Sequence, residues 1–556
     1  MKRINQLIVS LFAVSLLLMS CDSLLDVDSD RFITDENYRV NSPSDSLYSM
    51  IGVLTQLQKL SDSYVLLGEL RGDLLDVTEN ADVSLKELNN FNITTDNPYV
   101  NVADYYSIIN NCNYIIRYID TTYESEGERI LVSQFVQAKT IRAWTYLQLV
   151  LNFGSALYYE EPILSIDEAK ADYPEYDLYQ LADVLIKDLS PWKNVTKPRL
   201  GSVMDYSLGY SFFPVRMVLG DLYLWTGDYL NAATEYHDLL YDNNYTVSEN
   251  YQSFWVVEND VLTDNQLSIS WMMLFQSSSV AERITDIATS SRYGHASELD
   301  NMSSDISNQM IVPSQVALNN WNKDLFFKDD FDIDHDLRGK FGSISTMQII
   351  DNEGNIDAYD RIIKYSPVLG ETDENVYETR IYRNSLVYLR YAEAVNQLNK
   401  PNMAFAVLKN GLNNRTMTNP DLIPASEIGD VIPSYMDFTD LRFNSNIGTV
   451  MRGQGVRKNV NDVWVDARDP LTDSTFVIPA LPTLDDSVSY VDDLLIKELA
   501  LETAFEGNRF QDLMRFALRR SDPDFLADRV AEKHTTNKEA IRTLLRNTDN
   551  WYLPRK

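Results

Sequence analysis

Few residues of this chain have the type and spacing that catalysis requires. Its histidines lie apart from one another and from the two cysteines, so no HExxH or Cys/His pattern offers a zinc site. No GxSxG elbow occurs, and Gly453-Gln454-Gly455 lacks the strand and helix patterns that flank a phosphate-binding loop. With 82 acidic residues, some carboxylate pair at glycosidase spacing is almost certain by chance. We therefore predict no catalytic site and no cofactor. The histidines are His237, His295, His335 and His534.

One acidic stretch has the alternation of a calcium-binding loop. Asp330, Asp332, Asp334 and Asp336 alternate with other residues, as the oxygen ligands of an EF-hand do. The sixth and twelfth positions of such a loop need glycine and glutamate, and this stretch has neither. We predict that no metal binds here.

Cys21 is the residue with the clearest expected chemistry. An apolar run from Leu7 to Met19 follows Lys2 and Arg3, and as a helix it would span roughly 20 Å, less than the roughly 30 Å hydrocarbon core of a bilayer. This pattern predicts a secretory signal over residues 1–20 rather than a membrane span. Leu18-Met19-Ser20-Cys21 resembles a bacterial lipobox, in which the cysteine thiol takes a diacylglycerol group and becomes the new N-terminus. The alternative is an ordinary signal peptide with a chance cysteine.

The residues after Cys21 are polar and acidic, which is typical of a soluble tether over residues 21–44. Acyl chains on Cys21 would supply the membrane affinity, so the body of the protein needs no transmembrane helix. The second cysteine, Cys112, then has no partner, so no disulfide framework is expected. We predict that it packs as a small apolar residue.

The amino-acid composition limits the kinds of ligand that the protein is expected to bind. The 556 residues carry a formal net charge of −34, which repels nucleic acid and disfavours strongly anionic ligands unless a local basic patch overrides it. The chain also holds 33 Tyr, 21 Phe and 8 Trp, and aromatic side chains in loops suit sugars or extended peptides. Most of these rings are expected to pack between helices instead.

Apolar periodicity predicts a mainly helical protein. Helix-like spacing covers Asp45 to Leu60, Val65 to Leu75, Tyr105 to Ile119 and residues 134–154, with a polar loop expected from Val77 to Asn101. Two short stretches, residues 266–275 and 342–350, have strand-like patterns.

Two segments have the spacing of tetratricopeptide helix pairs. Gly220 and Ala232 lie twelve residues apart on either side of a break at Gly227, and Ala392 and Ala404 repeat that spacing. Small residues at these positions let two helices approach closely. The copies lie far apart, which predicts a helical scaffold with long irregular insertions rather than a regular solenoid.

Four stretches share motifs with a known family. They match its AxxxRAxxYxxLxxxFG, YAEAxN and ERxxELxxEGxRxxDLxR helices and its aromatic-Leu-Pro ending. The matching residues are Ala138, Arg142-Ala143, Tyr146, Leu149 and Phe153-Gly154; Tyr391-Ala392-Glu393-Ala394 and Asn396; Glu498-Leu499, Phe505-Glu506-Gly507, Arg509, Asp512-Leu513 and Arg515; and Trp551-Tyr552-Leu553-Pro554. With the Cys21 motif, these stretches resemble the SusD/RagB family of nutrient-uptake outer-membrane lipoproteins. Lys497 departs from the arginine that the family often has.

The resemblance implies a SusD-like fold, with a single domain over residues 45–556 and about four tetratricopeptide-like helix pairs near 105–154, 212–241, 385–415 and 492–520. It implies a lipid-anchored protein on the outer-membrane surface that covers a SusC-like TonB-dependent β-barrel transporter. It also implies capture of oligosaccharides, or of peptides in the RagB branch, without catalysis. A lipid-anchored glycosidase and a purely structural adaptor that recognises only protein are alternatives from other classes.

By position in the family, ligand contacts come from two loops, Arg71 to Tyr99 and Ser290 to His295. Tyrosine rings there would stack on a pyranose face or a peptide plane, and the polar side chains would bind hydroxyl groups. The candidate residues are Arg71, Asp73, Asn97, Tyr99, Arg292 and Tyr293.

The charged residues of the family motifs are expected to support the fold instead. In a helical repeat, such residues form buried pairs that fix helix packing, and losing one partner leaves an uncompensated charge. We assign this role to Arg142, Glu393, Glu498, Glu506 and Arg509. Asp336-Leu337-Arg338 resembles a structural D-x-R motif of the same family.

Overall fold

The structure is a computed structural model, and it describes residues 42–203, 206–247, 282–289, 298–304, 308–322, 336–340, 342–350, 356–365, 378–453, 456–458, 464–466 and 476–555. Several predictions fall outside these residues. They concern Cys21 and its motif, the strand over 266–275, Arg292, Tyr293, and the aspartates from 330 to 334.

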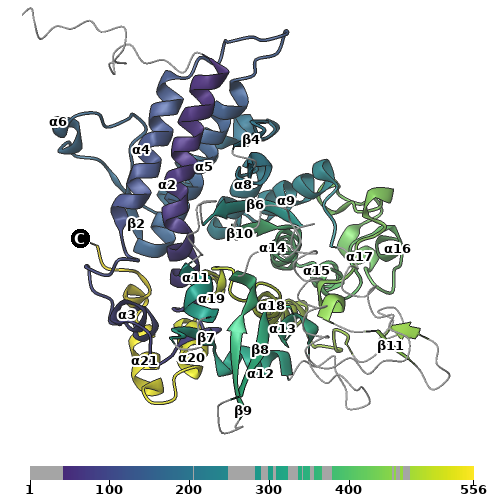
Figure 1. Cartoon of the computed structure of the whole chain (residues 1–556). Coiled ribbons are helices and arrows are strands. Elements are labelled where there is room, and N and C mark those ends of the chain that lie inside the picture. The colour runs from purple at the N-terminus through teal and green to yellow at the C-terminus, as the bar shows by residue number, and fades with distance from the viewer. Residues whose placement is uncertain are drawn as a thin grey trace, which may run out of the picture.

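Helices make up most of the described chain, and they are long where apolar periodicity predicted them (Figure 1). Their bounds are α2 Pro43–Glu69, α3 Val83–Asn90, α4 Val102–Tyr118, α5 Val132–Phe153, α6 Ile166–Ala169, α7 Leu178–Leu189, α8 Val215–Thr226, α9 Tyr229–Asn243, α11 Glu298–Ser304, α12 Gln315–Asn322, α13 Leu337–Lys340, α14 Asn384–Gln397, α15 Pro401–Lys409, α16 Asn414–Met417, α17 Ala425–Ile428, α18 Leu484–Glu502, α19 Arg509–Arg520, α20 Pro523–Glu532 and α21 Lys538–Leu545.

Strands are short, and those described pair two by two in antiparallel fashion. The pairs are β1 Leu75–Val77 with β7 Ile311–Pro313, β2 Ser155–Leu157 with β3 Glu175–Asp177, β4 Ser202–Val203 with β5 Tyr206–Ser207, β6 Arg283–Ala288 with β10 Glu378–Arg383, β8 Ile344–Ile350 with β9 Ile356–Ile362, and β11 Val456–Lys458 with β12 Trp464–Asp466. The strand predicted within 342–350 is therefore confirmed, as is the mainly helical class.

Consecutive helices pack as pairs, α4 with α5, α8 with α9, α14 with α15 and α18 with α19. The α8–α9 pair shows why the spacing of small residues matters. A Cβ on Gly220 would lie 2.5 Å from Cε1 of Tyr236, so only glycine allows this approach. Gly227 ends α8 with a φ of 80°, and Ala232 is fully buried at the contact.

Two expectations about the N-terminal third are wrong. The two stretches predicted as separate helices join in one helix, α2, which ends at Glu69, so the predicted helix up to Leu75 is too long. Within α2, Ser61 is buried and its hydroxyl lies 2.8 Å from that of Thr379 on β10. Ser61 therefore packs against β10 from within the helix and does not begin a loop. The loop predicted from Val77 to Asn101 contains α3, which Asp82 caps by accepting from the backbone N–H of Leu85.

The C-terminal helices α20 and α21 lie against α3, which is far from them in the sequence. Figure 1 shows α20 and α21 next to α3, and the Asn537 amide donates to Oδ1 of Asn90, the last residue of α3, at 3.0 Å. Buried apolar residues from Met50 to Leu553 form one contiguous core cluster. Among the described helices, none combines the length and the apolar character needed to cross a bilayer.

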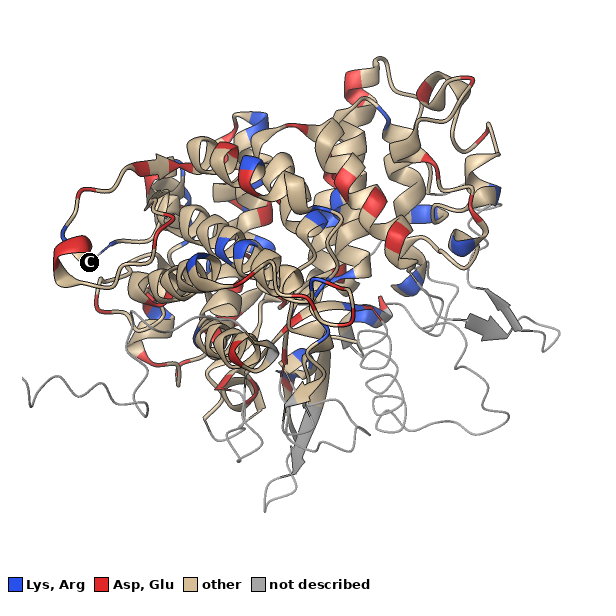
Figure 2. Cartoon of the chain, turned by 90° about the horizontal axis from the view of Figure 1, so that it is seen from above, with Lys and Arg blue, Asp and Glu red and all other residues tan. Residues whose placement is uncertain are grey.

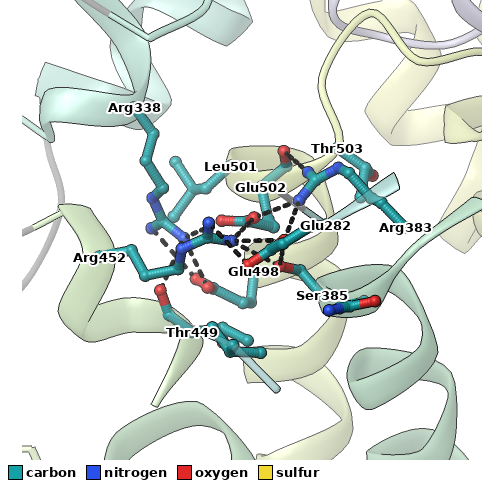
Figure 3. A network of polar contacts seen from close by, with 12 residues as sticks. Glu282, Arg338, Arg383, Ser385, Thr449, Arg452, Glu498, Leu501, Glu502 and Thr503 are labelled. Carbon is teal, nitrogen blue, oxygen red and sulfur yellow. Dashed lines mark hydrogen bonds and ion pairs between the residues drawn. The ribbon is translucent and has the colours of Figure 1, made fainter. Parts of the chain in front are cut away.

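A buried ion network joins the helical frame to its insertions (Figure 3). Arg338 contacts Asp336, Glu498 and Glu502, and its closest distance to Glu498 is 2.6 Å. Arg383 and Arg452 reach the same Glu502 at 2.6 and 2.8 Å. Asp336 thus pairs with Arg338, as the D-x-R resemblance implied.

The other motif charges also form buried pairs, which confirms the structural role predicted for them. The pairs are Arg142 with Asp188, Glu393 with Arg515 and Arg519, Glu498 with Arg338, Glu506 with Arg383 and Lys364, and Arg509 with Asp73. Cys112 is fully buried, as predicted, and its burial raises the pKa of the thiol to about 12.

The C-terminal end of α2 touches the turn before α19 so closely that no side chain fits between them. A Cβ on Gly68 would lie 1.9 Å from the backbone oxygen of Gly507. At the same contact, the Gly507 N–H donates to Oε1 of Glu69 at 2.8 Å. This backbone approach fixes α2 against the C-terminal helices.

Replacing Gly68 by alanine should therefore lower the free energy of unfolding by about 3 kcal/mol or more, because the new methyl group meets backbone that cannot rotate away. Gly52→Ala in the same helix is the matched control, since a Cβ there meets nothing within 4 Å. That variant should gain up to about 1 kcal/mol from helix propensity. Urea unfolding followed by circular dichroism measures both, and equal stability of the two variants would contradict the close approach.

Candidate ligand-binding site

The loop between α3 and α4 holds Tyr99 on the side of the protein where binding residues were predicted. Asn97 anchors this loop, because its side-chain amide donates to the Ser84 carbonyl at 2.9 Å and to the Glu87 carboxylate at 3.0 Å. Its Oδ1 accepts from the Tyr99 N–H at 3.1 Å. Asn97 itself is buried, so it positions Tyr99 rather than facing solvent.

Tyr99 is half-buried against the core, and three carboxyl groups lie near enough to affect the pKa of its hydroxyl. Burial raises the pKa of its hydroxyl, and the nearby charges of Asp82, Glu298 and Asp62 raise it further. These acids come from three elements: the N-cap of α3, the first turn of α11 and the middle of α2. A ring beside several hydrogen-bond acceptors is an arrangement that suits hydroxyl-rich ligands.

Asp62 is the least conventional member of this group. Burial raises the pKa of its carboxyl group from 3.8 to about 7, and the neighbouring Glu298 adds to the shift. Its Oδ1 is shielded from solvent and has no hydrogen-bond partner among the described residues. Near neutral pH the group can thus act as a donor when protonated and as an acceptor when ionised. Sequence reasoning missed Asp62, because it lies between the two stretches predicted as helical and no motif includes it.

The described ends of the two predicted binding loops lie near each other. Glu298 follows directly on residues 290–297, which contain Arg292 and Tyr293, and it is close enough to Tyr99 to affect its pKa. The pairing of β1 with β7 supports this arrangement. One hydrogen bond extends the pairing beyond the two strands, from the Thr78 N–H to the Met310 carbonyl at 2.9 Å. The contribution of Arg292 and Tyr293 to a site remains a prediction.

The prediction that Arg71 lies on an open loop is wrong. Arg71 is 1% exposed, and its guanidinium donates to the carbonyls of Leu67 and Trp551 and to the side chain of Asn152. The guanidinium also lies 4.4 Å from the centre of the Phe510 ring. Because these partners are uncharged, burial lowers the pKa of Arg71 to about 9.

Asp73 is also placed differently from the prediction. It is 2% exposed and accepts two hydrogen bonds from Arg509, at 2.6 and 2.9 Å. Gly72 permits this contact, because a Cβ there would lie 2.9 Å from Cγ of Arg509. Both residues are held by partners more than 400 positions away in the sequence, which local sequence patterns could not indicate.

Several solved structures resemble this chain over most of their length. A laminarin-binding SusD-like protein superposes with a TM-score of 0.55 at 15% identity, covering 93% of this chain and 96% of that one. NanU of B. fragilis gives a TM-score of 0.55 at 17% identity, covering 90% and 94%. A SusD-like carbohydrate-binding protein from Bacteroides fragilis gives 0.54 at 15% identity, covering 86% and 87%.

No family model matches the chain, and no curated protein matches it. The structural similarity therefore concerns the fold: this chain has the SusD-like fold, as its sequence motifs predicted.

Asp62→Asn should stabilise the protein increasingly as pH rises. A carboxyl group whose pKa is about 7 when folded and near 3.8 when unfolded favours folding at low pH, and this contribution is lost between about pH 4 and pH 7. The variant keeps a neutral side chain, so it should exceed the wild type by about 1–2 kcal/mol above pH 7, with a smaller difference at pH 5. Urea unfolding of both proteins from pH 5 to 8.5 measures this.

The comparison must be made between variant and wild type, because burial also raises the pKa of Glu69 to about 7 in both. Asp183→Asn, on the exposed surface of α7, is the control and should follow the wild type at every pH. A stability difference that stays constant or shrinks as pH rises would show that Asp62 does not titrate as described.

Proposed function

We propose that this protein is a surface-exposed, lipid-anchored nutrient-binding protein that captures an oligosaccharide and passes it to a SusC-like TonB-dependent transporter. The observation that carries the proposal is the SusD-like fold, which covers about nine tenths of this chain and of two structures compared above. One of these is a laminarin-binding protein, and a third matching structure is a carbohydrate-binding protein. The Cys21 motif supplies the anchor in this proposal.

The geometry around Tyr99 supports a carbohydrate ligand. Its ring offers an apolar face of the size of a pyranose, and Asp62 and Glu298 supply oxygen atoms that can bind hydroxyl groups at the rim. Asn97 fixes the loop, so less entropy is lost when a ligand binds. In the proposal, Arg292 and Tyr293 complete the site from the second loop.

A protein that delivers its ligand to a transporter needs to bind the ligand but not to change it chemically. The motif charges that an enzyme could have used are buried in ion pairs with one another. A peptide ligand of the RagB type is the alternative within the same fold, because a tyrosine ring also stacks on peptide planes.

One observation favours a second candidate, a lipid-anchored glycosidase. The pKa of Asp62 is raised and the neighbouring Glu298 contributes to the shift, and a carboxyl group with a raised pKa can serve as the acid in glycoside hydrolysis. The binding experiment below therefore also measures turnover.

Tyr99→Ala should weaken binding of the recognised oligosaccharide by about tenfold or more, because a stacked ring and its buried area are lost. Calorimetry against a panel of neutral oligosaccharides, including laminarin fragments, measures this on the wild type and on a Tyr293→Ala variant. Tyr179→Ala is the control, since this tyrosine is 62% exposed on α7, away from the site.

Unchanged affinity in both the Tyr99 and the Tyr293 variants would show that the ligand binds elsewhere. New reducing ends in the same samples, lost in Asp62→Asn, would replace the binding proposal by the glycosidase. Binding of unmodified peptides but of no glycan on the panel would favour the RagB-type alternative.

Cys21→Ser should move the protein from the membrane fraction to the soluble fraction of the exporting cell and abolish its labelling by palmitate, because the thioether forms on sulfur. Cys112→Ala is the control, as Cys112 is buried in the core and should not affect acylation. Membrane retention of the Cys21 variant would contradict the lipid anchor.

A further inference from the structure

A polar cleft of about 460 Å³ opens between α12, α18, α20 and α21, with α19 behind it. Asp73 and Arg509 form part of its wall, and Asn320 of α12 and Lys497 of α18 also line it. The predicted ligand contacts of the α3–α4 loop, Asn97 and Tyr99, do not line it. The cleft is therefore distinct from the site proposed above.

The acidic residues of the cleft already have basic partners. Asp73 and Asp528 bind arginines that also line the cleft, whereas Asp493 and Glu532 bind basic residues outside its lining. The four pairs are Asp73–Arg509 at 2.6 Å, Asp528–Arg542 at 2.7 Å, Asp493–Arg520 at 2.8 Å, and Glu532–Lys538. The charge of every carboxylate in the cleft wall is thus compensated.

Arg529 differs from these residues because it has no carboxylate partner among the described residues. Its guanidinium lies over the Phe525 ring at 3.6 Å, and Nη1 donates to the Phe525 carbonyl at 3.1 Å. These contacts fix the plane of the group and leave Nε and Nη2, which form one edge of the guanidinium, without an acceptor in the described part of the chain. Burial and the nearby Arg509 lower the pKa of Arg529, and the charges of Asp73 and Asp493 offset this only in part, so an anion at the free edge would stabilise the charged guanidinium.

We propose that this cleft binds a small molecule that carries a carboxylate group, with Arg529 as the residue that recognises it. The free edge of a fixed guanidinium presents two parallel N–H donors, which match the two oxygens of a carboxylate. The compensated acids and Asn320 can bind hydroxyl or amide groups on the rest of the ligand.

The overall charge of the protein narrows the class of ligand further. The net charge of −34 repels a multiply charged anion such as a nucleotide. A singly charged acid is repelled less, so the local positive charge of Arg529 can be enough to bind it. Figure 2 shows basic residues lying among acidic ones along the helices rather than gathered in one region. A sugar acid and the free C-terminus of a peptide both present such a group.

The test compares each acid with its uncharged counterpart. Glucuronate is titrated against glucose, and N-acetyl-dialanine against its C-terminal amide, using calorimetry on the full soluble chain. We expect saturable binding of at least one acid and at least tenfold weaker binding of its neutral counterpart. The pair that discriminates identifies the source of the carboxylate.

Arg529→Gln should lower the affinity for that acid by at least about tenfold, which is the effect of losing a bidentate charged pair. Arg529→Lys keeps the charge without the two parallel donors and should also bind more weakly than the wild type. Arg546→Gln is the matched control, because Arg546 forms a half-exposed pair with Asp524 outside the cleft.

Thermal unfolding verifies that the variants are folded, and Tyr99→Ala should bind the acid as the wild type does. This last result separates the cleft from the glycan site, so failure of one proposal does not affect the other. The proposal is overturned if neither acid binds better than its neutral counterpart, or if both Arg529 variants bind as tightly as the wild type.

Discussion

The arrangement of the helices depends on buried charges that cannot be left unpaired. Arg338, Arg383 and Arg452 meet Glu498 and Glu502 of α18 in the interior, where each group is at most 3% exposed by its side chain. The three cations hold the pKa of Glu502 well below its ordinary value, although burial alone would raise it. Removing one partner from such a network costs about 3–5 kcal/mol, because the remaining charge stays buried. Packings of α18 that leave one of these charges without its partner are therefore disfavoured.

The position of α18 determines where the candidate sites lie. The turn after α18 contains Gly507, whose N–H binds Glu69 and whose carbonyl touches Gly68, so the end of α2 is fixed there. Asp62 lies on the same helix two turns earlier, and Asp73 follows it. The Asp73–Arg509 pair then forms part of the wall of the cleft beside α18. The candidate site around Tyr99 and the cleft thus share one frame, although different side chains line them.

Sequence reasoning succeeded where the cause of a structure is local or repeated. Gly220 and Ala232 predicted a helix pair because only small residues allow that approach, and the family motifs identified Glu393 and Arg509 as structural charges. It failed where the cause is distant. Its sequence position suggests that Arg71 is an exposed loop residue, but distant partners such as the carbonyl of Trp551, 480 positions away, hold it in the core. Asp62 was missed for the same reason, since its burial comes from tertiary packing.

Whether a charged residue of this acidic protein has a partner depends on its environment and not on the sign of its charge. Inside the frame, opposite charges neutralise one another, and the pKa values of Arg338 and Glu502 shift so that both groups stay charged. At the candidate sites, Asp62 and Arg529 differ from these pairs: Asp62 has a shielded oxygen without a hydrogen-bond partner, and Arg529 is partly buried without a bound carboxylate among the described residues. An isolated polar group at the edge of a rigid frame gains more from a ligand than one that already has a partner, since a buried unmade hydrogen bond is costly. This asymmetry, rather than the net charge, indicates where the protein can bind other molecules.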